Sequence, residues 1–496
     1  MTAGLPVDMQ LSELFPGLIP AATPLDVSDI TAHSAEVVPG GLFLACGGGR
    51  QHVLRFLDDA LHRGAAAVAW EPQPQLARPL LPAGVAGLEI PGLRQRLGAI
   101  ANRFFASPSA ALAVTGITGT NGKTTVAWLL MQALGRLGRP AGYMGTLGHG
   151  SAAGLQAGAL TTPDCVTVHR RLRELADGGV REVAMEVSSH ALDQGRVDGV
   201  AFRTVAFTNL SRDHLDYHGD LAGYAAAKAR LFLEYGATVA VINLGDAFGR
   251  EIAGRLPAGM RLIGVSAVAG LPAAVSVQRR VADGTQRGLH LEVDGTRVAF
   301  DSPLPGAFNL ENLAVTAGIL HAGGFAPTAI AAALATCEAP PGRMQVLASA
   351  SGPRVVVDFA HTPDALRRAL EALRAEGPAR LWCVFGCGGE RDAGKRALMG
   401  AVARELADHL VLTDDNPRGE DPEAIIAAIR VGAGRGPGVE VIRDRAAAIR
   451  HAIAAAGRED TVLIAGKGHE SVQIVGRESR PFSDQAVALA ALAGRP

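Results

Sequence analysis

The 496-residue chain contains few cysteines, and their placement limits the chemistry that they can serve. The five, an odd number, are scattered at Cys46, Cys165, Cys337, Cys383 and Cys387. This distribution excludes a disulfide framework and favours a reducing compartment. Cys383 and Cys387 lie close enough to form half of a metal site, but no second Cys or His pair completes it. We therefore expect this pair to be buried core thiols.

The sequence also lacks blocks of like charge and long apolar runs. The formal net charge is −1, and no charged block suggests a surface for nucleic acid or anionic membrane. The first residues do not combine a basic segment with an apolar stretch, and no run is long and apolar enough to span a membrane. These absences predict a soluble cytoplasmic protein with small-molecule ligands, no nucleic-acid partner and no membrane insertion. We expect a monomer.

The length predicts more than one domain, because one domain usually holds roughly 100–200 residues. Hydrophobic residues make up 48% of the chain and charged residues 19%, which excludes disorder, while 61 glycines suit the tight turns of an α/β protein. Polar, proline-containing breaks occur at 102–110 and 338–343. We therefore predict three domains, at 1–108, 109–343 and 344–496.

Several short apolar runs are predicted to be strands, and most of them end in a cluster of polar residues. They are Leu112–Val114, Val183–Met185, Val205–Phe207, Val355–Val357 and Val462–Ala465. Amphipathic helical stretches alternate with them, which is typical of βαβ units around a parallel sheet. Ligands of such sheets bind at the carboxyl ends of the strands, so the polar residues that follow are candidates for a site.

The segment from Gly116 to Thr125 is predicted to be a phosphate-binding loop between a strand and a helix. Glycines let backbone N–H groups close around phosphate oxygens, and the helix N-terminus adds its positive end. Lys123 neutralises phosphate charge, and Thr124 can hold Mg²⁺. The generic G-x-x-x-x-G-K-[ST] template requires glycine where Ile117 stands, so the match is offset although its end is intact. The alternative is a glycine-rich turn without a ligand.

The run TGTNGKTT (118–125) resembles the ATP loop of the Mur ligases, a family that builds the peptide stem of the cell wall. Further motifs resemble that family in the same order along the chain: MEVSSHAL (185–192), TNLSRDHLDYHG (208–219), GAFNLEN (306–312), DFAHTPD (358–364), GCGGERD (386–392), DNPR (415–418) and GKGHE (466–470). The resemblance implies a smaller N-terminal α/β domain that binds a UDP-substrate, a central P-loop parallel-sheet domain and a C-terminal Rossmann-like domain. It also implies an ATP-dependent ligase that forms an amide bond through an acyl phosphate.

The resemblance implies two groups of residues around ATP and two Mg²⁺ ions. The ATP-binding group is Gly119, Thr120, Asn121, Gly122, Lys123, Thr124, Thr125, Asn309, Arg343 and Asp358. The catalytic and metal-binding group is Lys123, Thr124, Glu186, His214 and Lys228, with Lys228 carbamylated to a carbamate that can hold Mg²⁺. Without the resemblance, Lys228 is a solvated lysine on an alanine-rich helix, Glu186 is a buried partner of an arginine and Asn309 is a helix cap.

The resemblance also implies contacts with a UDP-muramoyl dipeptide, through Ser34, Thr161, Thr162, Ser188, Gln194 and Arg196. Hydroxyl and guanidinium groups suit diphosphate and carboxylate oxygens. Without the resemblance, the Thr-Thr-Pro segment is a turn or a helix start. The N-terminal domain departs from the family pattern at His33–Ala35 and at residues 51–52, which are Gln and His.

The second substrate is an amino acid, and the resemblance implies that Arg391, Asp415, Asn416, Pro417, Arg418, Gly466 and Glu470 bind it. The DNPR motif resembles the version of the family that selects meso-2,6-diaminopimelate, because the fork of Arg418 can bind a distal carboxylate that lysine lacks. Two alternatives remain. One is a ligase of the same superfamily that adds lysine, a dipeptide or glutamates to folate, and the other is a P-loop regulator without ligase activity.

Overall fold

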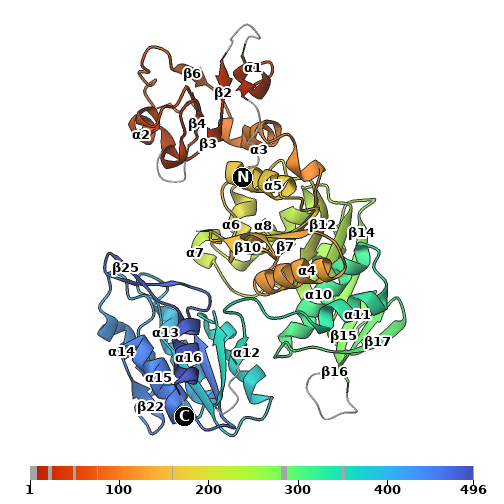
Figure 1. Cartoon of the computed structure of the whole chain (residues 1–496), viewed down its shortest axis with the longest axis vertical. Helices are drawn as coiled ribbons and strands as arrows, with labels where there is room; N and C mark the ends of the chain where they lie inside the picture. Colours follow the sequence, from red (N-terminus) through yellow and green to blue (C-terminus); the bar gives the residue numbers. More distant parts are fainter. Residues whose placement is uncertain are drawn as a thin grey trace. The chain divides into compact units, whose positions relative to one another are not determined.

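The computed structural model describes residues 8–19, 25–47, 52–74, 76–158, 160–280, 288–347 and 352–494. It shows a mixed α/β fold with main sheets of four, eleven and six strands (Figure 1). The predicted fold class, three domains each built around an α/β sheet, is confirmed. By packing, the chain divides into two compact units: Met1–Ser276 with Glu292–Thr296 and Ala314–Ala333, and Val277–Leu291 with Arg297–Leu313 and Leu334–Pro496. The boundaries at 108 and 343 stay predictions.

The N-terminal sheet is small and parallel, with the order β3-β4-β5-β6. Two apolar clusters hold it, one around Leu42 and Leu44 and one around Phe43 and Trp70, so that alternate β4 side chains face opposite sides. The elements of this region are β1 (Met9–Gln10), α1 (Leu11–Leu14), β2 (Asp26–Val27), β3 (Ile30–Thr31), η1 (Ser34–Glu36), β4 (Leu42–Ala45), η2 (Val53–Phe56), α2 (Leu57–His62), β5 (Ala67–Trp70), β6 (Ala86–Glu89) and α3 (Leu93–Phe104).

The central sheet has the order β10-β9-β8-β11-β7-β12-β13-β14-β15-β16-β17. The neighbouring strands β8, β11, β7, β12, β13, β14 and β15 all pair in parallel. Their carboxyl ends therefore lie along one edge of the sheet. The strands are β7 (Ala113–Thr118), β8 (Ala141–Gly145), β9 (Gly148–Ser151), β10 (Gly154–Gln156), β11 (Glu182–Glu186), β12 (Phe202–Phe207), β13 (Val239–Asn243), β14 (Arg261–Ser266), β15 (Val275–Arg279), β16 (Gly288–Val293) and β17 (Thr296–Asp301).

Helix α4 (Lys123–Arg136) shows how the sequence forms the helices that pack on the central sheet. It begins at Lys123, directly after Gly122 with φ +86°, and its buried residues include Val126, Leu129, Leu130 and Ala133, at helical spacing. The apolar face therefore packs on the sheet while the N-terminus stays at the strand ends. The helices of this part are η3 (Pro108–Ala110), α4 (Lys123–Arg136), α5 (Cys165–Asp177), α6 (Ser189–Asp193), α7 (Leu215–His218), α8 (Leu221–Leu233), α9 (Ala247–Ala253), α10 (Phe308–Ala322) and α11 (Pro327–Ala335).

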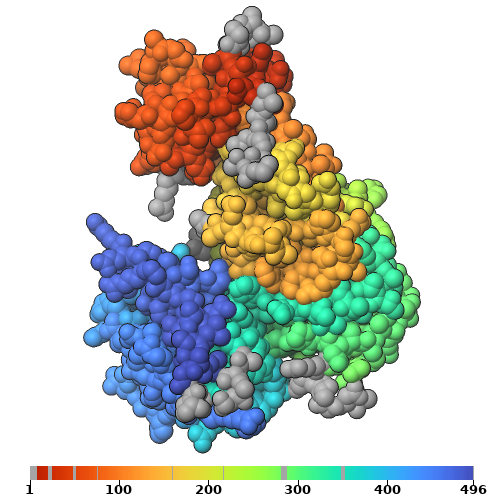
Figure 2. Space-filling view, in the orientation of Figure 1, coloured from red at the N-terminus to blue at the C-terminus, as the bar shows by residue number. Residues whose placement is uncertain are grey.

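The C-terminal sheet has the order β18-β19-β23-β20-β21-β22, parallel except for β18. Apolar clusters cover both faces of the sheet. Figure 2 shows this stretch of sequence in colours that run from teal to blue. Its elements are β18 (Gln345–Leu347), β19 (Arg354–Asp358), α12 (Pro363–Arg374), β20 (Leu381–Phe385), α13 (Gly394–Leu406), β21 (His409–Leu412), α14 (Pro422–Ala433), β22 (Val439–Val441), α15 (Arg445–Ala455), β23 (Thr461–Ala465), β24 (Val472–Val475), β25 (Glu478–Pro481) and α16 (Asp484–Ala493).

Most of the predicted local features are confirmed. All five predicted strands occur, in β7, β11, β12, β19 and β23, although β7 begins at Ala113, one residue later than predicted. All five cysteines are buried free thiols, including the close pair. Within the described residues, no helix has both the length and the hydropathy of a membrane span.

Candidate active site

The predicted phosphate loop lies at the carboxyl end of β7, and neighbouring loops hold it in place. Gly119 has φ +149°, and a Cβ there would lie 1.9 Å from Thr208 Oγ1, so only glycine fits. The N–H of Thr120 donates to the Asn209 carbonyl at 2.8 Å, and the N–H of Asn121 donates to the Asn209 side chain at 2.9 Å. The loop is therefore fixed to the segment after β12 before any ligand binds.

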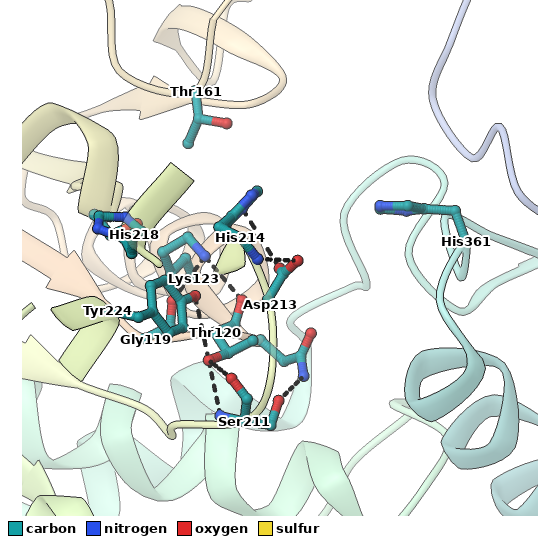
Figure 3. Close-up of polar contacts among 12 residues, drawn as sticks. Gly119, Thr120, Lys123, Thr161, Ser211, Asp213, His214, His218, Tyr224 and His361 are labelled. Atoms are coloured by element: carbon teal, nitrogen blue, oxygen red, sulfur yellow. Dashed lines mark hydrogen bonds and ion pairs between the residues drawn. The ribbon is translucent and has the colours of Figure 1, made fainter. Parts of the chain in front are cut away.

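Two lysine ammonium groups converge on one carbonyl oxygen of this loop. Lys123 donates to the carbonyls of Gly119 and Thr120, each at 2.9 Å, as Figure 3 shows. Lys228 donates to the same Gly119 carbonyl at 2.7 Å. The side chains of Lys123 and Lys228 therefore meet at the backbone of the loop that is predicted to hold phosphate.

Lys228 is buried rather than solvated, with 1% of its surface exposed, so the alternative of a surface lysine is wrong. It lies on α8, and its ammonium sits 4.3 Å from the centre of the Tyr224 ring. Burial, and secondarily the charge of Lys123, hold the pKa of Lys228 well below its usual value. A lowered pKa favours the neutral amine, which is the form that reacts with carbon dioxide.

Glu186 ends β11 and is fully buried. Within the described residues its carboxylate is bound by hydroxyl and amide groups, and no arginine pairs with it. Thr124 Oγ1 donates to Glu186 Oε2 at 2.9 Å, the Thr146 N–H donates to Oε1 at 2.9 Å, and the Tyr143 hydroxyl also contacts Oε1. Because Thr124 gives its proton to Glu186, its lone pairs can face a cation. These oxygen donors suit Mg²⁺.

His214 follows β12 in a left-handed backbone conformation, with φ +52°. Its Nε2 lies 3.4 Å from Asp213 Oδ2, as Figure 3 shows. Its ring packs edge-on to those of His190 and Tyr224. Within the described residues, no group of three or more His, Cys, Asp or Glu side chains converges to hold a metal. Magnesium commonly takes only one or two protein carboxylates together with phosphate and water oxygens, so this donor set fits that ion.

The structure brings five of the predicted muramoyl-dipeptide residues into one hydrogen-bonded network. Thr162 Oγ1 donates to the Glu186 carbonyl at 2.9 Å and accepts from the Ser188 N–H at 3.1 Å. Arg196 donates to the Thr162 carbonyl at 2.9 Å and to Gln194 Oε1 at 2.6 and 2.9 Å. Thr161 reaches the same network through its hydroxyl, which lies 3.0 Å from Thr146 Oγ1.

The alternative prediction for the Thr-Thr-Pro segment, a helix start, is also supported by the structure. The residues before Pro163 lead into α5, whose N-cap Asp164 accepts from the N–H groups of Val166 and Thr167. Thr162 is 1% exposed, so its hydroxyl is used within the protein. A helix start and a substrate-facing loop are compatible here, because Thr161 remains partly exposed.

Ser34 opens the short helix η1 in the N-terminal region and is partly exposed. Its neighbour His33 lies 3.3 Å from Asp164 Oδ2, the N-cap of α5. The hydrogen bond with Asp164 raises the pKa of His33 despite partial burial. Of the departures predicted for this region, Gln51 lies outside the described residues.

The predicted amino-acid-binding residues form a second cluster, at the carboxyl ends of β20, β21 and β23. Asp415 and Asn416 are buried after β21, and a Cβ on Gly466, after β23, would lie 2.6 Å from Asp415 Oδ2. Asn416 Nδ2 donates to Glu470 Oε2 at 2.8 Å. Arg418 donates to the Gly389 carbonyl at 2.8 Å.

Arg391 belongs to the same cluster through the loop after β20. A Cβ on Gly388 would lie 2.9 Å from Arg418 Nη1 and 3.7 Å from Arg391 Cγ, and one on Gly389 would lie 2.0 Å from the Pro417 carbonyl. Glycines therefore let this loop pack directly on the Pro417–Arg418 turn. The side chains of Arg391 and Arg418 therefore both lie beside Gly388, and a guanidinium group can bind a carboxylate through two hydrogen bonds.

The remaining predicted ATP residues lie in the same compact unit as this second cluster. Asp358, at the end of β19, accepts from the N–H groups of Met344 and Ala360, and burial raises its pKa against the effect of Arg343. The Arg343 guanidinium lies 4.4 Å from the centre of the Phe359 ring. Asn309 lies in α10 and donates to the Pro305 carbonyl at 2.6 Å, so it is not the helix cap.

Some residues that organise the phosphate loop were not individually predicted from the sequence. Tyr143 and Thr146 contact Glu186 from the end of β8, while Ser211 and Thr208 support the loop from the segment after β12. Ser211 N–H donates to Thr120 Oγ1 at 2.9 Å. The sequence signal for Thr146 is its position directly after a buried strand, β8. This strand pairs with β11, so its carboxyl end lies beside Glu186.

The fold and the two polar clusters define a nucleotide-binding enzyme of the multidomain α/β class. Family models match residues 117–320, as the Mur ligase middle domain, and residues 342–468, as the Mur ligase glutamate ligase domain. The chain is 50% identical over 475 residues to UDP-N-acetylmuramoyl-L-alanyl-D-glutamate--2,6-diaminopimelate ligase of Alkalilimnicola ehrlichii, which covers 94% of this chain and 95% of that protein. The protein of the same name from Xanthomonas campestris pv. campestris is 49% identical over 490 residues, with 98% of both chains covered.

A solved structure of an enzyme of that name has a TM-score of 0.69 and 34% identity to this chain, covering 98% of this chain and 99% of the other. The chain therefore belongs to the Mur ligase family. It is an enzyme of the ligase class.

Proposed function

We propose that this chain is the ATP-dependent ligase that adds meso-2,6-diaminopimelate to the D-glutamate of UDP-N-acetylmuramoyl-L-alanyl-D-glutamate. The observation that carries the amino-acid assignment is the cluster of Arg391 and Arg418 around Gly388, beside Asn416 and Glu470. Diaminopimelate has a second carboxylate that these guanidinium groups can bind, whereas lysine would present an ammonium group there. The reaction belongs to peptidoglycan precursor synthesis in the cytoplasm.

The first chemical step brings two anions together, the D-glutamate carboxylate and the γ-phosphate of ATP. Lys123 and the N-terminus of α4 offset this repulsion, because both place positive charge at the loop. An oxygen of the carboxylate bonds to the γ-phosphorus and ADP leaves, which gives an acyl phosphate. The amine of the incoming amino acid attacks this acyl phosphate, which forms the amide and releases phosphate. The chain supplies no covalent nucleophile in this scheme, only orientation and charge.

Thr124, Glu186, His214 and Lys228, as a carbamate, are the residues that would hold two Mg²⁺ ions. Bound Mg²⁺ neutralises charge on the transferring phosphoryl group. Glu186 orients the Thr124 hydroxyl at 2.9 Å, so the loop presents an oxygen in a fixed position. Carbamylation would turn Lys228 from a cation into an anion in the pocket that now holds its ammonium beside Lys123.

The alternative within the same family is a ligase that adds lysine. A competition assay with purified enzyme, ATP and the UDP-dipeptide, and equal concentrations of meso-diaminopimelate and L-lysine, separates the two. We expect the tripeptide product to contain diaminopimelate. A product that contains mainly lysine would overturn the substrate assignment while leaving the ligase activity intact.

Arg418→Ala tests which residue selects the substrate. We expect the KM for diaminopimelate to rise by about 10–100-fold, the range expected for a lost hydrogen-bonded ion pair, while the KM for ATP stays nearly unchanged. Arg458→Ala is the matched control, since it removes an exposed guanidinium of the same compact unit. An equal rise of both KM values in Arg418→Ala would argue for a structural role instead.

A further inference from the structure

Lysine is rare in this chain, and its positions are unusual. Only four of the 47 Lys and Arg residues are lysines: Lys123, Lys228, Lys395 and Lys467. The chain therefore uses arginine at almost every basic position. Lys123 and Lys228 belong to the phosphate loop described above. Lys467 is not among the residues assigned so far, yet it is 0% exposed, which is rare for a lysine.

Two glycines turn the Lys467 side chain into the protein. Gly466 has φ +117° and Gly468 has φ +54°, conformations that favour glycine. A Cβ on Gly468 would lie 2.7 Å from the Gly342 carbonyl, and one on Gly466 would lie 2.6 Å from Asp415 Oδ2. The backbone on both sides of Lys467 is thus closely packed, which fixes the direction in which its side chain leaves the loop.

The Lys467 ammonium closes a triangle of hydrogen bonds with two predicted amino-acid-binding residues. It donates to Glu470 Oε2 at 2.7 Å and to Asn416 Oδ1 at 2.9 Å. Asn416 Nδ2 in turn donates to the same Glu470 oxygen at 2.8 Å. The Ile474 N–H also donates to Asn416 Oδ1, at 3.0 Å, so the orientation of the amide is determined.

This triangle leaves the two oxygens of Glu470 in different environments. Oε2 accepts from Lys467 and Asn416, whereas Oε1 accepts no hydrogen bond in the described part of the chain. The Glu470 side chain is 31% exposed, so the carboxylate is also accessible. The ammonium of an amino acid can therefore reach Oε1 while Oε2 remains fixed.

We propose that Lys467 is a positioning residue for the incoming amino acid: it holds Glu470 and Asn416 so that Glu470 Oε1 faces the substrate ammonium. This inference rests on the proposed function, because it uses the amino-acid site assigned there. An ammonium suits the position better than a guanidinium, since one compact donor serves two acceptors at 2.7 and 2.9 Å inside a fully buried space.

The test is steady-state kinetics of the full chain with ATP, the UDP-dipeptide and meso-diaminopimelate. Lys467→Met removes the ammonium and keeps an unbranched side chain. We expect the KM for diaminopimelate to rise about 10–100-fold, from the loss of hydrogen bonds to a carboxylate, and the KM for ATP to change less than about twofold. Lys467→Gln is the second variant, should the methionine variant fail to fold.

Two comparisons distinguish positioning from a general loss of structure. Arg354→Met breaks the Arg354–Glu376 ion pair at the opposite strand ends of the same sheet, and should lower thermal stability without raising the diaminopimelate KM. In a Glu470→Gln background, Lys467→Met should add less than about twofold to that KM, because Lys467 acts through Glu470. The inference would be overturned if the effects of Lys467→Met and Glu470→Gln on the diaminopimelate KM multiplied in the double variant. It would also be overturned if Lys467→Met alone left that KM unchanged.

The wild-type chain separates this inference from the function on which it rests. If wild type does not join diaminopimelate to the UDP-dipeptide, the proposed function fails. If wild type is active and Lys467→Met has the same diaminopimelate KM, only the role of Lys467 fails.

Discussion

Lys228 donates a hydrogen bond to the carbonyl oxygen of Gly119 at 2.7 Å, from a side chain that is almost completely buried. An ammonium group in this position is costly, because burial and the nearby charge of Lys123 both disfavour it. Conversion to a carbamate removes that positive charge and supplies oxygens for a cation. The contact therefore connects the folded phosphate loop with the proposed chemistry.

The lowered pKa of Lys228 gives a prediction about pH and bicarbonate. The neutral amine becomes more abundant as the pH rises through that lowered pKa, so carbamylation should already be favoured at pH values where an ordinary lysine stays charged. We expect enzyme depleted of bicarbonate at acidic pH to lose activity and to regain it with bicarbonate at neutral pH. Lys228→Ala should be inactive under both conditions. Activity that does not respond to bicarbonate, with an unmodified lysine by mass spectrometry, would contradict the carbamate.

The contact between Thr124 and Glu186 predicts a change in the magnesium requirement. Thr124→Val keeps the shape of the side chain but removes the oxygen that Glu186 orients at 2.9 Å. We expect the Mg²⁺ concentration for half-maximal activity to rise about 10–100-fold, the range typical for disturbed metal-site partners. Thr125→Val is the adjacent comparison and should shift it less. A wild-type Mg²⁺ titration for Thr124→Val would show that this hydroxyl does not serve the metal.

The fully buried pair of Arg445 and Asp484 predicts a stability effect that is separate from catalysis. Arg445 Nε and Nη2 donate to the Asp484 carboxylate at 2.7 and 2.8 Å, and both side chains are 0% exposed. Asp484→Asn leaves a buried charge without its partner, which should lower the free energy of unfolding by about 3–5 kcal/mol. The exposed Arg255–Glu251 pair gives the control, since Glu251→Gln should cost about 1 kcal/mol or less. Urea unfolding monitored by circular dichroism measures the free energy of unfolding of both variants. Equal losses in Asp484→Asn and Glu251→Gln would contradict the prediction that the buried pair contributes more than the exposed one.

The contact between His33 and Asp164 should make stability depend on pH in the N-terminal region. The folded-state pKa of His33 is raised, chiefly by its hydrogen bond with Asp164. Its contribution is therefore fully present below the unfolded pKa of about 6.5 and is lost as the pH rises through the higher folded value. We expect His33→Ala to lower the melting temperature at pH 5.5 to 6, and to have a smaller effect near pH 8.5. A pH-independent difference would indicate that ionisation of His33 is not involved.

The sequence predicted those parts of the site whose residue types and order follow local rules. Strand, glycine loop and helix occur at Ala113–Arg136 as expected, and the polar clusters after β11, β12 and β23 lie at strand ends. The burial of Lys228 could not be predicted from its surroundings, because its alanine-rich helix resembles a solvated one. Burial depends on how α8 packs against β7, which is a tertiary property.

The partners of Glu186 show the same limit. Tyr143 and Thr146 reach it only because β8 pairs in parallel with β11, with Met144 opposite Met185. Neither strand specifies this register by its own sequence, since β8 is buried throughout and β11 has apolar residues at three successive positions, without an alternating pattern. Likewise, the Lys467 triangle joins residues separated by about fifty positions, which no local pattern predicts.

The most direct test of the account is phosphate release from ATP by the wild-type chain. We expect release only when Mg²⁺, the UDP-muramoyl dipeptide and meso-diaminopimelate are all present, with one amide product formed for each phosphate. Lys123→Ala should reduce kcat by about 10²–10³-fold, the effect of removing one preorganised charge-stabilising group. Phosphate release that needs neither substrate would contradict the ligase mechanism and favour a P-loop regulator.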